Sequence, residues 1–209
     1  LGVREAVTGC SRTDAGVHAN DFCCAIKTES NIDCYRFMGA LNAVLPDSVA
    51  VKSCREMPLD FHPRYDCKSK RYLYRVWNSA AKNPFLKNYA YHYKNKLDAD
   101  FLNGQAQQFV GTYDFCGFCS SGSSVEDTVR TIYSFRVERK GDEVDFLVEG
   151  DGFLYNMVRI MVGTLIEISE KRIEKDTLID IIEAKDREKA GRTAPACGLY
   201  LDSVNYGEA

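Results

Sequence analysis

The sequence predicts an α+β fold: a mainly antiparallel sheet with helices on one side and a cleft on the other. Two observations favour this class. Stretches with the two-residue alternation of strands are interspersed with stretches of helical periodicity in both halves of the chain, and no βαβ spacing repeats. In addition, Lys140-Gly141-Asp142 separates two alternating stretches and is a hairpin signal, which places those strands next to each other and antiparallel.

In the first half, short apolar or alternating runs indicate strands and capped periodic runs indicate helices. Asp33 is a plausible N-cap and Pro46 ends the helix that follows it. Residues 71–77 alternate so that Tyr72, Tyr74 and Val76 share one face. We expect a buried strand at 22–26 and further strands at 49–54, 71–77 and 89–93. Helices are expected at 33–45 and 98–110.

The second half continues the same mixture. Hairpin strands are expected at 128–138 and 143–149, helices at 153–168 and 176–184, and a last strand at 198–204. The serine- and glycine-rich stretch 120–124 is expected to be a mobile surface loop. We expect two α+β halves, 1–95 and 96–209.

Composition narrows the class of protein. The chain has 209 residues, 45% of them hydrophobic and 27% charged, which is ordinary for a globular protein. The richest apolar stretch, 153–166, contains Arg159, so no membrane-spanning helix is expected. The nine cysteines show no even framework of spacings and no secretory signal precedes them, which favours reduced thiols and a cytoplasmic location.

The pair Cys116 and Cys119 has the spacing of a redox or metal site. A zinc site would need a second pair or nearby histidines, and the three histidines of the chain stand at no recognised spacing from it. We therefore expect no metal at this pair.

The stretch 11–19 gathers several reactive side chains around a turn. Asp14-Ala15-Gly16 is typical of a turn, because Asp can bond the backbone that follows it and Gly accepts a positive φ. Arg12 is placed to hold the Asp14 carboxylate ionised. The alternative is an ordinary surface turn with a neighbouring salt bridge.

Arg159 lies within an otherwise apolar helical stretch. A charge in such surroundings is unfavourable unless it is paired, and Asp14 is the candidate partner. The alternative is an arginine at the helix edge that extends its head to solvent.

Two groups of basic residues could contact phosphates despite the net charge of −3. The alternative is a solvated strand face and a charged loop. The groups are Arg64, Lys68, Lys70, Arg71 and Arg75, and Lys185, Arg187, Lys189 and Arg192.

Five blocks beyond the 11–19 stretch carry a family resemblance: Phe61-His62-Pro63-Arg64, Lys70 to Arg75, Gly111 to Phe115, Phe153 to Arg159 and Gly198 to Leu201. Together they resemble the tRNA pseudouridine synthase A family from about Gly9 to Tyr206. The resemblance implies a pseudouridine synthase fold and a cofactor-independent isomerase. Its implied reaction converts uridine to pseudouridine at positions 38–40, in the anticodon stem-loop of tRNA.

The family's site residues carry over by motif. The resemblance implies that Asp14 is the nucleophile, that Arg159 pairs with it and that Tyr72 lines the site, while Leu199 contacts the target base. It also implies an RNA-binding cleft and a homodimer. The expected RNA contacts are Arg12, which would fill the gap left by a flipped base, and His18, Arg64, Lys70, Arg71 and Leu199.

Family members begin about fifty residues earlier, so we expect the chain to be truncated at its start. Two other functions stay open at this point. One is an RNA-binding module without catalysis. The other is an N-glycosidase, which would leave an abasic product where an isomerase leaves the mass unchanged.

Overall fold

A computed structural model describes residues 5–122 and 125–207. Two compact units divide the chain: residues 1–10 and 23–66 contribute to one, and residues 11–22 and 67–209 to the other, as far as they are described. The predicted halves meeting near residue 95 do not coincide with these units. The reason is pairing: β4 (Ser69–Trp77), from the predicted first half, lies between two strands of the second.

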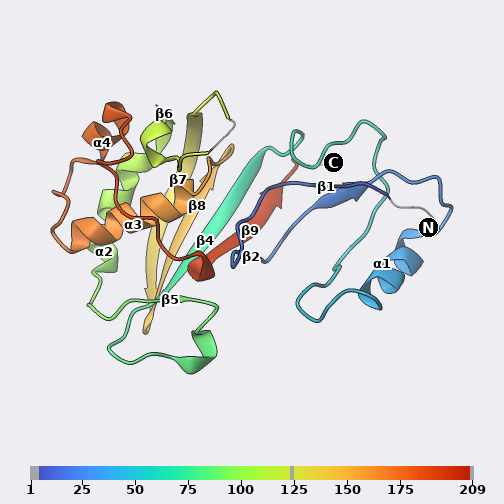
Figure 1. The fold of residues 1–209 in the computed structure, drawn as a ribbon, viewed down its shortest axis with the longest axis horizontal. Coiled ribbons are helices and arrows are strands. Elements are labelled where there is room, and N and C mark those ends of the chain that lie inside the picture. Colours follow the sequence, from blue (N-terminus) through green and yellow to red (C-terminus); the bar gives the residue numbers. More distant parts are fainter. Residues whose placement is uncertain (1–4, 123–124, 208–209) are drawn as a thin grey trace. The chain divides into compact units, whose positions relative to one another are not determined.

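The larger unit contains a seven-stranded sheet, whose main order is β2-β9-β4-β8-β7-β6, with β5 beside β4 (Figure 1). The β2–β9 and β4–β5 pairs are parallel and all the others antiparallel, which confirms the mainly antiparallel α+β prediction. The remaining strands are β2 (His18–Ala19), β5 (Tyr91–His92), β6 (Gly111–Asp114), β7 (Val129–Lys140), β8 (Glu143–Gly150) and β9 (Leu199–Asn205).

Strand β4 carries the predicted alternation into the core. Tyr72, Tyr74 and Val76 are 6%, 0% and 0% exposed, and Tyr72 lies opposite Val148 and Leu201 on the neighbouring strands. The hairpin at Lys140-Gly141-Asp142 is confirmed, since Lys140 pairs with Glu143 and Gly141 has a φ of +62°.

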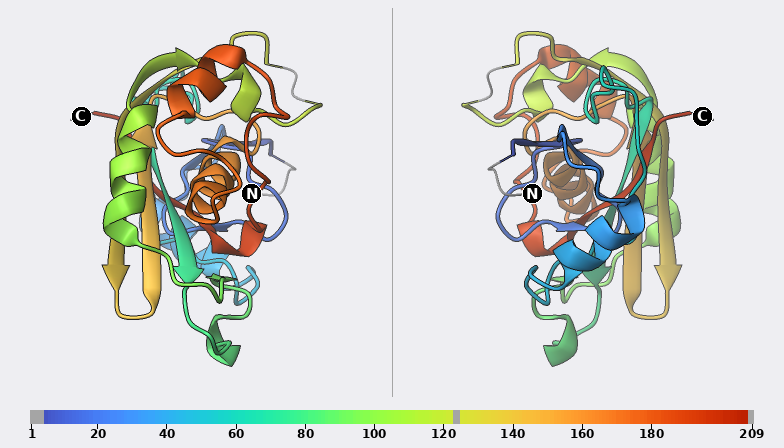
Figure 2. Two further views of the ribbon diagram at one scale, coloured as in Figure 1. Left: turned by 90° about the vertical axis from the view of Figure 1, so that its left-hand side faces the viewer. Right: turned by 90° about the vertical axis from the view of Figure 1, so that its right-hand side faces the viewer.

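Helix α2 (Ala99–Ala106), α3 (Met157–Ser169) and α4 (Leu178–Ala184) belong to the same unit, and Figure 2 shows α3 along one face of the sheet. The predicted helix at 98–110 is confirmed, with its last turn tightened into the 3₁₀ segment η2 (Gln107–Phe109). Three further 3₁₀ turns are η1 (Pro84–Leu86), η3 (Cys116–Phe118) and η4 (Ala196–Gly198).

Helix α3 forms the centre of the core, with ten buried residues, but begins later than the prediction of 153. Asn156 has a φ of +61°, and Leu154 accepts from the N–H of Met157 in a turn. A left-handed residue cannot continue a right-handed helix, so the apolar stretch divides into a turn and a helix. Gly163 of α3 packs directly against the Arg192 carbonyl group.

The smaller unit is built from a two-stranded antiparallel sheet, β1 (Val7–Gly9) with β3 (Cys24–Ile26), and from helix α1 (Cys34–Asn42). Asp33 caps α1 as predicted, accepting from the Arg36 N–H at 2.9 Å. The predicted burial of the first strand is wrong, because Cys24 is exposed in this short sheet.

The strand predicted at 49–54 is also wrong. The backbone N–H and C=O of Val51 bond instead to the side-chain amide of Asn42, at 2.7 and 3.0 Å. Of the predicted mobile loop, residues 123–124 lie outside the described residues. Within the described ranges, no helix is long and apolar enough to cross a membrane.

Candidate active site

The loop that carries Asp14 is fixed to the large sheet at its far end. Gly16 has the positive φ (+82°) that the sequence predicts for this turn, and Val17 donates to the Asp14 carbonyl at 3.0 Å. His18 and Ala19 then pair with Tyr200 and Leu201 as the parallel strand β2. A turn secured in this way presents the Asp14 side chain from a fixed backbone.

Arg159 contacts Asp14, as predicted. Its Nη1 lies 3.0 Å from Oδ2 of Asp14, and the two side chains are 15% and 34% exposed. The contact removes the alternative of an arginine that extends to solvent. It joins α3 to a loop that precedes it by 145 residues.

Two further acceptors orient the guanidinium of Arg159. Nε donates to the Ala194 carbonyl at 2.7 Å, and Nη1 also donates to Oδ1 of Asn156 at 2.7 Å. The N–H of Ala194 in turn donates to the Arg159 carbonyl at 3.0 Å. Sequence reasoning missed both acceptors, and only the position of Asn156, three residues before Arg159 on the turn into the helix, could have indicated one of them.

Tyr72 lies beside the same loop. Its hydroxyl and that of Ser11 are 3.1 Å apart, and its ring meets Phe153 edge-on at 5.1 Å between centroids. Arg159 and Tyr72 thus come from α3 and from the β4 face that Tyr74 shares.

Leu199 lies in register with Tyr74 on the neighbouring strand and is 7% exposed. Tyr74 is a residue that sequence reasoning treated only as core. Its buried hydroxyl donates to the Pro195 carbonyl at 2.8 Å, and burial raises the pKa of that phenol. Tyr74 thereby anchors the segment that supplies the Ala194 carbonyl to Arg159.

The predicted pairing of Arg12 with Asp14 is wrong. Arg12 is exposed, and it makes no hydrogen bond or ion pair with Asp14 or any other described residue. Arg159 supplies the cation instead.

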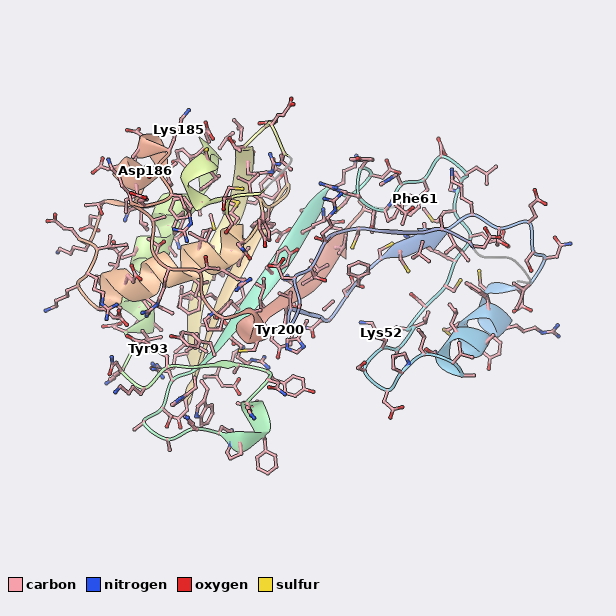
Figure 3. All side chains as sticks on the ribbon, in the orientation of Figure 1. Lys52, Phe61, Tyr93, Lys185, Asp186 and Tyr200 are labelled. Atoms are coloured by element: carbon pink, nitrogen blue, oxygen red, sulfur yellow. The ribbon has the colours of Figure 1, made fainter. Side chains whose placement is uncertain are left out.

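His18 is engaged in packing. Its ring stacks on Tyr200 and Tyr89, at 4.7 and 5.2 Å between centroids, and Nε2 donates to the Asn88 carbonyl at 2.8 Å. Tyr200, labelled in Figure 3, also donates from its hydroxyl to the Tyr89 carbonyl at 2.6 Å. The histidine therefore ties the Asp14 loop to the segment that follows η1.

The first basic group is divided between the two units. Arg64 belongs to the smaller unit, where its guanidinium lies 5.9 Å from the centre of the Tyr65 ring. Lys70 and Arg71 belong to β4 of the larger unit; Lys70 is 9% exposed, and Arg71 pairs with Asp202 at 2.8 Å.

The second basic group is mostly held in internal bonds. Lys185 bonds Asp114 at 2.7 Å (Lys185 is labelled in Figure 3), and Arg192 bonds Glu170 at 2.9 Å. Arg187 donates to the Ala190 and Gly191 carbonyls and to the Thr193 hydroxyl. Much of this charge stabilises the segment around residues 190–193.

All nine cysteines are free thiols. Cys116 begins η3 and Cys119 follows it. In the part of the chain that the structure describes, no group of three or more His, Cys, Asp or Glu side chains could hold a metal ion.

Comparison with known proteins defines first a class and then a family. A family model described as tRNA pseudouridine synthase matches residues 105–207, and relatives that match nearly the whole chain define the class as that of the pseudouridine synthases. The tRNA pseudouridine synthase A of Clostridium acetobutylicum is 46% identical over 96% of this chain and 82% of its own length. That of Acetivibrio thermocellus is 47% identical over 98% and 84%, and that of Brevibacillus brevis 44% over 96% and 82%. The chain belongs to the tRNA pseudouridine synthase A family.

Proposed function

We propose that this protein isomerises uridine to pseudouridine in tRNA, at positions 38–40 of the anticodon stem-loop, with Asp14 as the nucleophile. The assignment of Asp14 as the nucleophile rests on one observation more than on any other. Its carboxylate is paired at 3.0 Å with an arginine of a buried helix, in a chain of this family. The specific positions rest on the family resemblance.

The reaction requires little more than an oriented carboxylate. The bond from the sugar C1′ to N1 of uracil breaks, the base turns, and a bond from C1′ to C5 forms. The hydrogen leaves C5 and a proton is gained at N1, so atoms and electrons balance without an oxidant or a group donor. Asp14 would add to C1′ or stabilise the positive charge that develops on the sugar, as carboxylates do in glycoside hydrolysis.

The other site residues support this step by position. Arg159 holds the Asp14 carboxylate through Nη1. The ring of Tyr72, under the loop, offers a face for stacking on the detached base and a hydroxyl that can move a proton. Leu199 would contact the base from β9. The RNA-binding cleft is therefore proposed on the α3 side of the sheet.

To reach Asp14 the uridine must leave its helical stack. Arg12, exposed two residues before Asp14 and without a described partner, is the side chain that we propose fills the vacated space. His18, Arg64, Lys70 and Arg71 remain proposals as RNA contacts. Of these, Arg71 is placed best, since its exposed guanidinium can exchange the Asp202 carboxylate for a phosphate.

We further propose a homodimer that acts in the cytoplasm. The family resemblance supports the dimer, and nine unpaired thiols are typical of a reducing compartment. Light scattering of the fully active enzyme at micromolar concentration tests the dimer, and a monomer would contradict it.

The test of the function is Asp14→Asn, which keeps shape and removes the charge. With unmodified tRNA we expect no pseudouridine from the variant and tRNA binding within about threefold of the unaltered protein, because phosphate contacts supply most of the affinity. Asp142→Asn, in the exposed hairpin turn, is the matched control and should keep full activity.

Two results would contradict the proposal. Turnover by Asp14→Asn would remove the carboxylate from the mechanism. Loss of the mass of uracil from the RNA, in place of an unchanged mass, would show an N-glycosidase.

A further inference from the structure

The guanidinium of Arg159 has five N–H donors, and their use can be counted. Nε–H donates to the Ala194 carbonyl, and the two hydrogens of Nη1 go to Asp14 and Asn156. No described residue accepts from Nη2, which leaves two donors. Nη2 is also open to solvent, because the only buried side-chain nitrogen or oxygen without a hydrogen-bond partner in the described chain is Oε2 of Glu170.

We propose that Asn156 is a positioning residue for the reaction: it fixes the rotation of the Arg159 guanidinium so that Nη1 holds Asp14 and the two hydrogens of Nη2 face the target nucleotide. The inference rests on the proposed function and adds a residue to it. The acceptors available to Nη2 on that nucleotide are the uracil carbonyls, the ribose hydroxyls and the phosphate.

The backbone at Asn156 supports a dedicated role. Asn156 stands at the N-cap position of α3, yet its side chain caps no helix N–H. Its φ of +61° is uncommon for a residue other than glycine, although asparagine tolerates it better than most. This conformation coincides with a side chain that points to Arg159 and not to the end of its own helix.

The side-chain amide is held from its other end as well. Nδ2 of Asn156 donates to the Ser120 hydroxyl at 3.0 Å, and the N–H of Ser120 donates to the Tyr155 carbonyl at 3.1 Å. With Nδ2 engaged as a donor, Oδ1 is left to face Arg159 as an acceptor. A chain of hydrogen bonds therefore runs from Ser120 through Asn156 and Arg159 to Asp14.

The test compares two substitutions that separate the effect of losing the side-chain amide from the effect of straining the backbone. Asn156→Gly removes the amide and keeps the left-handed conformation, whereas Asn156→Ala removes the amide and also strains the backbone. We expect both variants to lose about ten- to a hundredfold in the single-turnover rate of pseudouridine formation, the scale of a small misplacement in a site. The dissociation constant for tRNA should change less than threefold, and only the alanine variant should melt clearly below the glycine variant.

Asp176→Gly is the matched control. Asp176 also has a left-handed φ, of +62°, and accepts a side-chain hydrogen bond from Gln105, away from Arg159. The single-turnover rate of Asp176→Gly should stay within twofold of that of the unaltered protein.

Three outcomes would overturn the inference while the unaltered protein remains active: a normal rate in Asn156→Gly, a rate loss in the alanine variant alone, or an equal loss in Asp176→Gly. An inactive unaltered protein would instead count against the proposed function itself.

Discussion

The guanidinium of Arg159 donates to three acceptors, and its removal measures how much these hydrogen bonds contribute to stability and activity. Arg159→Leu leaves the Asp14 carboxylate, the Ala194 carbonyl and the Asn156 amide without their donor. Breaking a fully buried pair costs about 3–5 kcal/mol. Because Asp14 is 34% exposed, we expect a smaller loss of about 1–3 kcal/mol in the free energy of unfolding, together with loss of activity.

Urea unfolding of Arg159→Leu beside Arg71→Leu measures this difference. Arg71 also pairs with an aspartate, at 2.8 Å, but its side chain is 45% exposed, so its removal should cost less than about 1 kcal/mol. Equal losses in the two variants would show that the Arg159 network adds no stability of its own.

At the scale of single residues, the sequence pointed to Asp14 by its turn and to Arg159 by its apolar surroundings, because an arginine in an apolar helix needs an anion. The family resemblance supplied the pairing of the two and the place of Tyr72 in the site. The Ala194 carbonyl could not be predicted, because every residue type carries one. Arg12 was the nearer cation in sequence, but distance along the chain does not determine which side chain meets Asp14 in space.

Helix α3 is fixed by how closely it approaches its neighbours, and glycine substitutions can show this. An added Cβ at Gly163 would lie 2.9 Å from the carbonyl carbon of Arg192 and closer still to its oxygen, whereas one at Gly104 of α2 would meet nothing within 4 Å. The backbones of Gly163 and Arg192 cannot move apart without a large cost in free energy. We expect Gly163→Ala to destabilise the protein by about 3 kcal/mol or more.

Gly104→Ala is the matched substitution, since it also lies within a helix. It should stabilise the protein by about 0.5–1 kcal/mol through the better helix propensity of alanine. Thermal or urea unfolding of both variants gives the comparison, and a harmless Gly163→Ala would contradict the packing described for α3.

At the scale of elements, prediction succeeded where the signal is local. Alternation in β4, the turn of the β7–β8 hairpin and the Asp33 cap are all contained in a few neighbouring residues. It failed where a distant group competes. Alternation at 49–54 does not reveal that the Asn42 amide takes both backbone bonds of Val51 and leaves no strand partner.

At the scale of the whole molecule, the two units differ from the predicted division at residue 95, because strand pairing decides which segments share a unit. Residues 11–22 belong with the large sheet because β2 pairs with β9, although the chain on both sides belongs to the smaller unit. Sequence order alone does not indicate such an exchange, because each strand carries the same pattern whichever neighbour it has.

At the scale of the whole molecule, the stability of the protein should depend on pH through Asp114. This residue ends β6 and bonds Lys185, which directly follows α4. The hydrogen bond from Lys185, with that from Thr128, holds the pKa of Asp114 below its ordinary value of 3.8. A carboxyl whose pKa is lowered by folding stabilises the folded state above its unfolded-state value, and this contribution is lost as pH falls through the folded-state value.

We therefore expect Asp114→Asn to lower the free energy of unfolding at pH 7, and the difference from the unaltered protein to narrow below pH 3.8. Urea unfolding at pH 7 and pH 3 measures both differences, with Asp142→Asn as the control. A difference that stays constant over this range would contradict the Asp114–Lys185 interaction.

The pairing of β2 with β9 also has a consequence for synthesis on the ribosome. Ala19 leaves the ribosome 182 residues before Leu201, the residue that it lies beside in the sheet. At translation rates of about 5–20 residues per second, the Asp14 loop waits about 10–40 s for its strand, and a similar time for Arg159. During that interval the nascent chain has a complete reactive loop but no site, so enzymatic activity can arise only once nearly all of the chain shown here has emerged.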